Sequence, residues 1–170
     1  MKNNLFLILL ALLGMATAAS AQKDKSKRPS PPATVTAIVG GKTITIEYSQ
    51  PSVKGRKVWG DLVPYGEVWR TGANETTSIE VGADVEVQGQ ALAKGKYALY
   101  TIPDEKEWTV IVNNTIAWGA YKYKQKEDVL RVIATPKPST EFHEKFTIEI
   151  SEQGVVSLLW ENLRVEFTVK

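Results

Sequence analysis

The sequence predicts an all-β domain, either an antiparallel β-sandwich or a flattened barrel, that carries two long loops. Apolar and polar residues alternate with a period of two through most of the chain after residue 33, and no segment after residue 21 keeps a long helical period. Turn-forming residues separate the alternating segments at intervals of roughly eight to twelve residues, which is typical of sandwiches and barrels. The stretches 50–74 and 113–127 break the alternation and are the predicted loops.

Side-chain alternation predicts the strands one by one. In the segment 43–48, Ile44, Ile46 and Tyr48 fall on one face, because successive strand residues point to opposite faces of a sheet. The same pattern occurs in the segments 85–87, 108–112, 146–150 and 163–169. The segment 129–133 is apolar on both faces apart from one arginine, which favours a central strand.

Glycine and other turn-forming residues predict the connections. Gly40-Gly41 lies between two alternating segments, where a two-residue primed turn needs the positive φ angles that glycine accepts. Other turns are expected at 82–84, 88–90, 93–96 and 152–154. Glu161-Asn162 is expected to close the last hairpin, because asparagine tolerates the left-handed conformation.

Composition excludes several classes of protein. The chain has 170 residues, no cysteine and one histidine, which excludes a thiol nucleophile, a disulfide, a zinc ribbon and a metal site built from several histidines. The 21 Lys and Arg residues nearly balance the 19 Asp and Glu residues, for a net charge of +2. This balance gives no overall reason to expect nucleic acid as a partner, and we expect neither a metal nor another cofactor.

The N-terminal residues have the composition of an export signal. Lys2 precedes the apolar run Leu5–Leu13, and a small-x-small cleavage site ends at Ala21. Because a membrane-spanning helix needs about 20 apolar residues, this run is too short to be an anchor. Residues 1–21 are therefore predicted to be a signal peptide cleaved near Ala21, which leaves a mature chain without a transmembrane span. We expect the protein in the periplasm or outside the cell.

The mature chain is predicted to consist of a leader and one domain. Residues 22–32 are basic and rich in proline, which is typical of a disordered or extended segment. Residues 33–170 are predicted to form a single β-domain, and a chain of this size buries enough surface to fold without disulfides.

Several motifs resemble those of a known family. The longest run reads Tyr48-Ser49-Gln50-Pro51, Lys54-Gly55-Arg56, Trp59 to Gly66 and Val68 to Glu75. Further pieces are Lys94 to Tyr97, Tyr100 to Pro103, Glu107 to Ile111, Trp118 to Tyr121, Glu127 to Val132 and Trp160 to Val165. Over nearly the whole mature chain, the sequence closely resembles the secreted bacterial family catalogued as domain of unknown function 2911. The resemblance supports the expected fold and compartment, and it implies no particular chemistry because that family brings no established activity.

Candidate ligand-binding residues lie in the two loops, because loops on a rigid scaffold often carry binding sites. They are Arg56, Trp59, Tyr65, Trp69, Arg70, Asn74, Glu75, Trp118 and Tyr121. Arg70 offers a planar charged fork, Asn74 offers donors and an acceptor, and Trp69 offers a stacking surface, which together suit a sugar or a sugar acid. In the structural alternative, Trp69 fills the core and Asn74 caps a turn. Arg70 then pairs with Glu67 or Asp61.

The remaining candidates also have two interpretations. Arg56, in the basic segment 54–57, either binds an anion or is solvated. The aromatic segment 118–123 either stacks on a ring or covers one end of the barrel. The carboxylates Asp61, Glu67 and Glu75 are either a general acid and base, as in glycosidases, or surface charges. The sequence assigns no catalytic residue.

Three functions follow from these alternatives. The first, which we favour, is a noncatalytic envelope module that binds a polar ligand such as a carbohydrate. The second is a small hydrolase or lyase that uses Arg70, Asn74, Glu75 and a carboxylate partner, which requires these side chains to converge in one cleft. The third is a structural or partner-binding envelope protein with an exposed sheet face.

Overall fold

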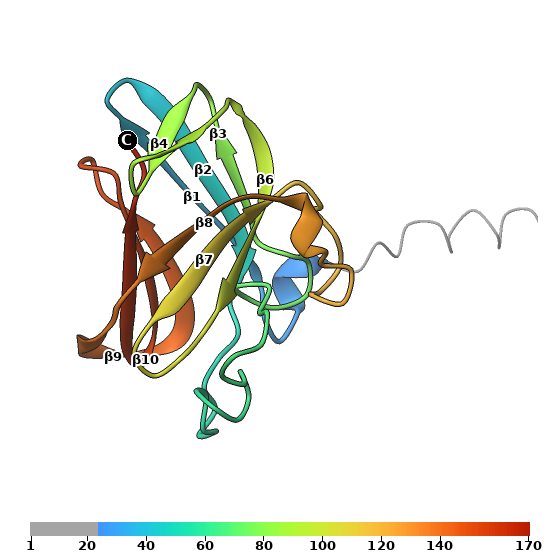
Figure 1. The fold of residues 1–170 in the computed structure, drawn as a ribbon. Coiled ribbons are helices and arrows are strands. Elements are labelled where there is room, and N and C mark those ends of the chain that lie inside the picture. The colour runs from blue at the N-terminus through green and yellow to red at the C-terminus, as the bar shows by residue number, and fades with distance from the viewer. Residues whose placement is uncertain (1–23) are drawn as a thin grey trace, which may run out of the picture.

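The computed structural model describes residues 24–170, which form an antiparallel β-sandwich (Figure 1). One layer is a six-stranded sheet in the order β1-β2-β3-β6-β7-β8. Its strands are β1 (Pro32–Val39), β2 (Lys42–Ser49), β3 (Ser78–Val81), β6 (Gly95–Ile102), β7 (Trp108–Asn113) and β8 (Asp128–Ala134). The predicted all-β class is confirmed, and the sheets form a sandwich rather than a closed barrel. The predicted signal peptide, 1–21, lies outside the described residues.

The second layer is built on the pair of β9 (Pro136–Ile150) and β10 (Val155–Thr168). The short hairpin of β4 (Val85–Val87) and β5 (Gln90–Leu92) extends this layer. The backbone N–H of Glu86 donates to the carbonyl of Lys170 at 2.7 Å, and the N–H of Lys170 donates back at 2.9 Å. These bonds attach β4 beside the end of the chain. Short 3-10 helices, η1 (Lys25–Lys27) and η2 (Gln125–Glu127), precede β1 and β8.

The two-residue primed turn predicted at Gly40-Gly41 is confirmed. Val39 pairs with Lys42 across it, and the two glycines have φ angles of 55° and 81°. Positive φ at both central positions is the type I′ geometry, whose twist matches that of the flanking strands.

Strand β8 lies at the edge of the six-stranded sheet, so the predicted central position of the segment 129–133 is wrong. Val129 and Ile133, on the outer parity, are exposed. The β4–β5 hairpin covers the edge with glutamine side chains. Nε2 of Gln88 donates to the carbonyl of Ile133, and Nε2 of Gln90 donates to that of Arg131, both at 2.8 Å. These amides hydrogen-bond backbone carbonyls of β8 that would otherwise be available to a strand of another chain, as at an uncovered sheet edge.

Glu161 and Asn162 lie within β10, so the turn predicted there is wrong. The register with β9 shifts between Leu159 and Glu161, and again between Glu161 and Leu163. Glu161 has a φ of 56°, and a β-bulge absorbs such a residue without reversing the chain. The connection between β9 and β10 is the predicted turn at 152–154.

The main core lies between the two layers. Ile44, Ile46 and Tyr48 are buried in it, as their alternation predicts. The hydroxyl of Tyr48 accepts a hydrogen bond from the backbone N–H of Ile148 at 3.0 Å, which ties β2 to β9 across the sandwich. A cluster of four tryptophan side chains, with ring centroids 5.0 to 6.3 Å apart, belongs to the same core. Its members are Trp59, Trp69, Trp108 and Trp160.

The two predicted loops connect strands of the large sheet. Residues 50–77 link β2 to β3, and residues 114–127 link β7 to β8. Parts of both loops pack on the outer face of that sheet, where Ala98, Tyr100 and Ile111 form a second small core with Val68 and Tyr123. The loops are therefore held by the sheet. Within residues 24–170, no helix has the length and apolar character needed to cross a membrane.

Candidate functional site

A pocket of about 230 Å³ collects three of the candidate residues, Arg56, Trp69 and Arg70. We call it the two-arginine pocket. It is lined by Ser30, Pro51, Arg56, Leu62, Val63, Trp69, Arg70, Gly72, Ala73 and Trp160. Most of these residues belong to the loop 50–77, whereas Trp160 comes from β10 and Ser30 precedes β1. The pocket thus forms where the long loop meets the second layer.

Trp69 anchors this loop to the sheet. Its backbone N–H donates to the carbonyl of Thr101 in β6 at 2.7 Å, and the N–H of Thr101 donates back at 2.9 Å. Its indole Nε1 donates to the carbonyl of Gly72 at 3.0 Å. The side chain is only 9% exposed, so Trp69 belongs to the core as the structural alternative expects. It lines the pocket without presenting an open stacking face.

The turn that follows Trp69 holds a conformation that is rare for its residues. Thr71 and Asn74 have φ angles of 55° and 59°, and a positive φ is unusual for a β-branched residue such as threonine. The hydroxyl of Thr77 donates to the carbonyl of Thr71 at 2.6 Å, and the hydroxyls of Thr71 and Thr101 lie 3.1 Å apart. Strained backbone persists where the surroundings hold it in place, and it is frequent at binding sites.

Gly72 is required by this turn. It has a φ of 153°, and a Cβ atom there would lie 3.0 Å from the carbonyl oxygen of Ser49 and 3.1 Å from Oγ1 of Thr77. Gly72, packed this closely against Ser49 and Thr77, also lines the two-arginine pocket.

Arg70 is half-buried in the pocket, and its side chain has no partner among residues 24–170. Its Nε is buried without a hydrogen bond, and its guanidinium forms no salt bridge with any carboxylate among residues 24–170. The pairing with Glu67 or Asp61 considered above is therefore absent. Burial lowers the pKa of Arg70, and nearby Tyr121 acts in the opposite direction. Arginine nevertheless stays charged in proteins, so the pocket contains an uncompensated positive charge.

Arg56 supplies the second positive charge. Its Nε donates to the carbonyl of Val53 at 3.1 Å, and its Nη2 donates to that of Ser52 at 2.6 Å. Two of the five N–H groups of this guanidinium are thereby used, and the backbone carbonyls hold its orientation. The residue is otherwise exposed.

Three other aromatic candidates do not line the two-arginine pocket. Trp59 belongs to the tryptophan cluster, and its Nε1 is buried without a hydrogen-bond partner. Tyr65 is 37% exposed and its ring lies against Gly60. Tyr121 is highly exposed, with its ring against Gly119.

The remaining candidates, Asn74, Glu75 and Trp118, gather where the two loops meet. The N–H of Gly119 donates to the carbonyl of Asn74 at 3.2 Å, and Glu75 and Trp118 form an antiparallel bridge. The side-chain amide of Asn74 donates to the carbonyl of Ser30 at 2.9 Å. Asn74 therefore connects the loop to the segment before β1.

That segment is the predicted leader, and its described part is built into the domain rather than free of it. Nη1 of Arg28 hydrogen-bonds both carboxylate oxygens of Glu75, and Nζ of Lys25 lies 3.2 Å from Oε1 of the same residue. The guanidinium of Arg28 also lies 5.9 Å from the ring centroid of Trp118, within the range of a cation–π contact. The basic residues of this segment supply partners for a carboxylate and a ring.

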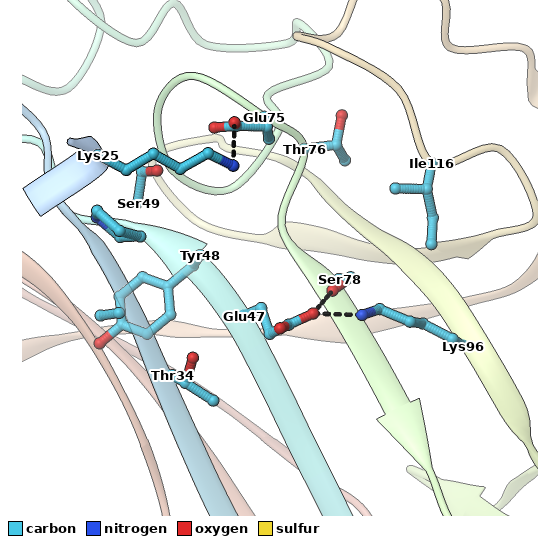
Figure 2. Close-up of a pocket in the computed structure, with 12 residues that line it drawn as sticks. Lys25, Thr34, Glu47, Tyr48, Ser49, Glu75, Thr76, Ser78, Lys96 and Ile116 are labelled. Carbon is cyan, nitrogen blue, oxygen red and sulfur yellow. Dashed lines mark hydrogen bonds and ion pairs between the residues drawn. The ribbon is translucent and has the colours of Figure 1, made fainter. Parts of the chain in front are cut away.

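A second pocket of about 270 Å³ lies beside these contacts, between the leader and the outer face of the large sheet (Figure 2). Glu75 with Lys25 occupies one part of its lining, and Glu47 with Lys96 and Ser78 occupies another. Its charges are thus paired with one another. Burial raises the pKa of Glu75, but its own backbone N–H, Arg28 and Lys25 outweigh burial and hold the pKa below its usual value.

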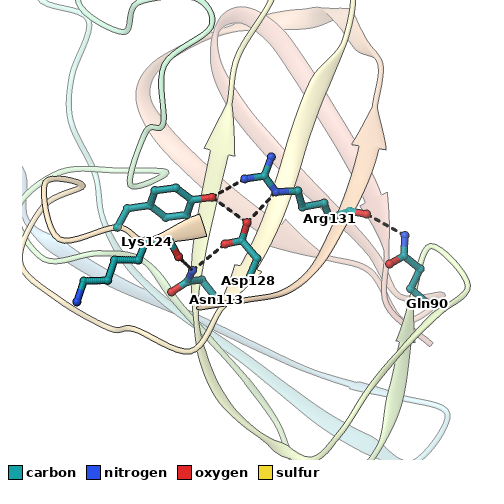
Figure 3. Close-up of polar contacts among 6 residues, drawn as sticks. Gln90, Asn113, Lys124, Asp128 and Arg131 are labelled. Atoms are coloured by element: carbon teal, nitrogen blue, oxygen red, sulfur yellow. Dashed lines mark hydrogen bonds and ion pairs between the residues drawn. The ribbon is translucent and has the colours of Figure 1, made fainter. Parts of the chain in front are cut away.

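A polar network fixes the second loop where it enters β8 (Figure 3). Asp128 accepts hydrogen bonds from Nε of Arg131 at 2.7 Å, from the hydroxyl of Tyr123 at 2.8 Å and from Nδ2 of Asn113 at 2.7 Å. Nδ2 of Asn113 also donates to the carbonyl of Lys124 at 3.1 Å. These bonds bring the end of the loop close to β7 and explain why Asn113 is buried.

Sequence reasoning missed several of the residues around both pockets. No local pattern connects Trp160 to Arg70. Lys25 and Arg28 lie in the segment 22–32, whose composition predicts no contact with the domain. Within the described part of the chain, no group of three or more His, Asp or Glu residues is placed to hold a metal ion.

Comparison with known proteins identifies the family. Neither the curated proteins nor the solved structures contain a significant match to the chain. Residues 30–169 match the family described as "Protein of unknown function (DUF2911)". The match covers all ten strands, both long loops and the lining of the two-arginine pocket. The chain therefore belongs to the DUF2911 family, as the resemblance of its motifs implies.

Proposed function

We propose that this protein is an exported, noncatalytic binding module whose polar ligand occupies the two-arginine pocket. The observation that carries the proposal is the state of Arg70, a half-buried guanidinium without a carboxylate partner among the described residues. A buried charge without a partner is costly to the folded protein. Such a group is typical of a site where a ligand supplies the missing contact.

The chemistry of the lining supports binding rather than catalysis. None of the ten lining residues is Asp, Glu, His or Lys, so the pocket offers no side chain suited to act as a general base. The hydrolase alternative requires Arg70 and Glu75 to converge. They line different pockets, and Glu75 is paired with Arg28 and Lys25, which counts against that alternative.

A carbohydrate is the ligand class that we propose. The pocket combines guanidinium donors with an apolar wall formed by Pro51, Leu62, Val63 and the indoles of Trp69 and Trp160. A ring with an apolar face and polar substituents matches such a lining. Export is part of the proposal and depends on the signal-like sequence of residues 1–21. If the mature protein isolated from the native cell does not begin near Gln22, the export part of the proposal is wrong.

Intrinsic tryptophan fluorescence tests ligand binding, because Trp69 and Trp160 line the pocket. The mature protein is titrated with a panel of neutral and acidic mono- and oligosaccharides. We expect at least one member to give a saturable change in emission whose midpoint Arg70→Gln shifts to clearly higher ligand concentration. Lys57→Gln is the matched control, since Lys57 is exposed in the same basic segment and does not line the pocket. A panel without any saturable response contradicts the proposal.

A further inference from the structure

The two-arginine pocket contains the side-chain groups needed to bind an anion. Arg56 and Arg70 are the ionisable residues of its lining, and both are positive. The hydroxyl of Ser30 is the one other hydrogen-bonding side chain there apart from the two indoles. A pocket in which donors outnumber acceptors in this way is complementary to a ligand that carries acceptors.

The guanidinium of Arg70 has no partner among the described residues. Its Nε is buried without a hydrogen bond there, and the group forms no salt bridge with any carboxylate of residues 24–170. Nε1 of Trp69, by contrast, is satisfied by the carbonyl of Gly72. Buried donors are normally satisfied, so an unpartnered guanidinium N–H beside a pocket calls for an explanation. A bound ligand that offers an oxygen acceptor is such an explanation.

The second arginine is oriented in advance. Hydrogen bonds to the carbonyls of Ser52 and Val53 fix two N–H groups of Arg56, which lowers the entropy that ligand binding must overcome. The remaining N–H groups of a guanidinium form a planar fork that fits a carboxylate through two parallel hydrogen bonds.

The volume of the pocket and its apolar lining residues indicate which kind of anion fits. A volume of about 230 Å³ is just below the roughly 300–1,000 Å³ of pockets that hold drug-sized ligands, which suits a ligand of about one sugar ring. The apolar wall of Pro51, Leu62 and Val63 provides nothing for a bare phosphate ion, which is polar on every side. It does provide contact area for the carbons of a ring.

We propose that the two-arginine pocket recognises a carboxylate-bearing sugar, a uronic acid, through the guanidinium groups of Arg56 and Arg70. This inference rests on the proposed function and names the ligand class. The ring packs on the apolar wall and the carboxylate binds the arginines. The binding is then strongest at low ionic strength, because salt screens charge pairs at a partly exposed site.

Isothermal titration calorimetry with matched probes tests the inference. The mature protein is titrated with D-glucuronic acid and D-galacturonic acid, with the neutral sugars D-glucose and D-galactose, and with inorganic phosphate. The acid and neutral members of each pair differ in one group. We expect a uronic acid to bind about tenfold or more tightly than its neutral partner, the effect of one charge-assisted hydrogen-bonded group. Its affinity should fall as sodium chloride is added.

Variants locate the binding. Arg70→Gln should lower uronic acid affinity by about tenfold or more and leave the weak affinity for the neutral sugar nearly unchanged. Arg70→Lys keeps the charge without the planar fork, so it should give an intermediate affinity. Lys57→Gln is the control for the loss of one nearby charge. Circular dichroism and thermal unfolding of each variant establish that it folds.

The outcomes separate the two proposals. Equal affinities for the acid and neutral sugars overturn the inference and leave the proposed function in place. Affinity for the uronic acids that Arg70→Gln does not change overturns the inference and also contradicts the assignment of the ligand to the two-arginine pocket. Phosphate binding that exceeds uronic acid binding in an Arg70-dependent way also overturns the inference. If neither uronic acid binds, the inference is wrong, whereas the proposed function fails only if the whole saccharide panel gives no response.

Discussion

Nη1 of Arg28 donates hydrogen bonds to both carboxylate oxygens of Glu75, at 3.1 and 2.9 Å. This contact joins the segment before the first strand to the turn after Trp69, 47 positions further along the chain. The same carboxylate also pairs with Lys25. The contact explains why a basic, proline-rich segment is held against the domain, and it places that segment beside both pockets.

We expect Glu75→Gln to release the leader. The neutral side chain no longer pairs with Arg28 and Lys25, and partly exposed ion pairs of this kind contribute about 0.2–1 kcal/mol each. Limited trypsin digestion should therefore cleave after Lys25 and Lys27 faster than in the wild type, while the domain keeps its thermal midpoint within a few degrees. Glu47→Gln, which removes a carboxylate paired with Lys96, is the control. Equal cleavage rates in all three proteins would contradict the prediction.

The pH dependence of this contact has a definite direction. The pKa of Glu75 is held below its usual value of 4.5 in the folded protein, so its contribution to stability is present above the unfolded pKa. This contribution is lost as the pH falls through the lower, folded pKa. Trypsin is inactive at such acidity, so hydrogen exchange of residues 24–30 is the suitable measurement. Protection of these amides that does not decrease on acidification would exclude Glu75 as the anchor.

Arg70→Gln should leave the protein as stable as the wild type, or make it more stable. A half-buried guanidinium without a carboxylate costs free energy, and a neutral amide removes part of that cost. Urea denaturation should give an equal or higher midpoint. A decrease of about 2 kcal/mol or more in the free energy of unfolding would mean that Arg70 has a structural role, since that is the usual effect of breaking a packed polar contact.

The tryptophans of the two loops should differ sharply in their effect on stability. Trp69 is buried in the tryptophan cluster and Trp118 is 50% exposed. Trp69→Ala should lower the free energy of unfolding by about 3–5 kcal/mol, whereas Trp118→Ala, which loses its contact with Arg28, should cost about 1 kcal/mol or less. Chemical denaturation followed by far-ultraviolet circular dichroism measures both. Similar losses for the two variants would mean that Trp69 is not part of the core.

Tyr48 should make the protein less stable at high pH. Burial raises the pKa of its hydroxyl above 10.0, so its stabilisation is complete below the unfolded pKa and is lost as the pH rises through the folded pKa. Tyr48→Phe should cost about 1–3 kcal/mol near neutral pH, because it leaves the N–H of Ile148 without an acceptor. It should also reduce the decline in stability above about pH 10. An unchanged alkaline decline would assign that decline to other tyrosines.

Asp128→Asn should loosen the second loop. The substitution replaces a charged acceptor of three side-chain hydrogen bonds, and bonds to a charged group contribute about 1.5–3 kcal/mol. We expect a thermal midpoint several degrees lower and faster hydrogen exchange in residues 114–127. Glu127→Gln changes a neighbouring carboxylate outside this network and is the control. If both variants unfold at the same temperature, the network does not stabilise the loop.

The sequence by itself determined the class of fold, because a period of two is a local property of a strand that is buried on one face. It predicted the faces of β2 and β7, the primed turn at Gly40-Gly41 and both long loops. It was wrong at Glu161, where the structure has a bulge in place of a turn, and at β8, which is an edge strand although its residues are apolar on both faces. In both cases the outcome depends on the neighbouring chain rather than on the segment itself.

The tertiary structure alone decided which candidates share a site. Local pattern does not reveal that Trp160 and Arg70 line one pocket, that Arg28 pairs with Glu75, or that Gln90 binds β8. Each of these relationships joins residues that are distant in sequence. Local pattern likewise does not tell a buried loop tryptophan from an exposed one, since Trp69 and Trp118 stand in similar aromatic loops. Burial and the presence of a partner are properties of the packed chain. Of the nine candidate residues, three line the two-arginine pocket: Arg56, Trp69 and Arg70.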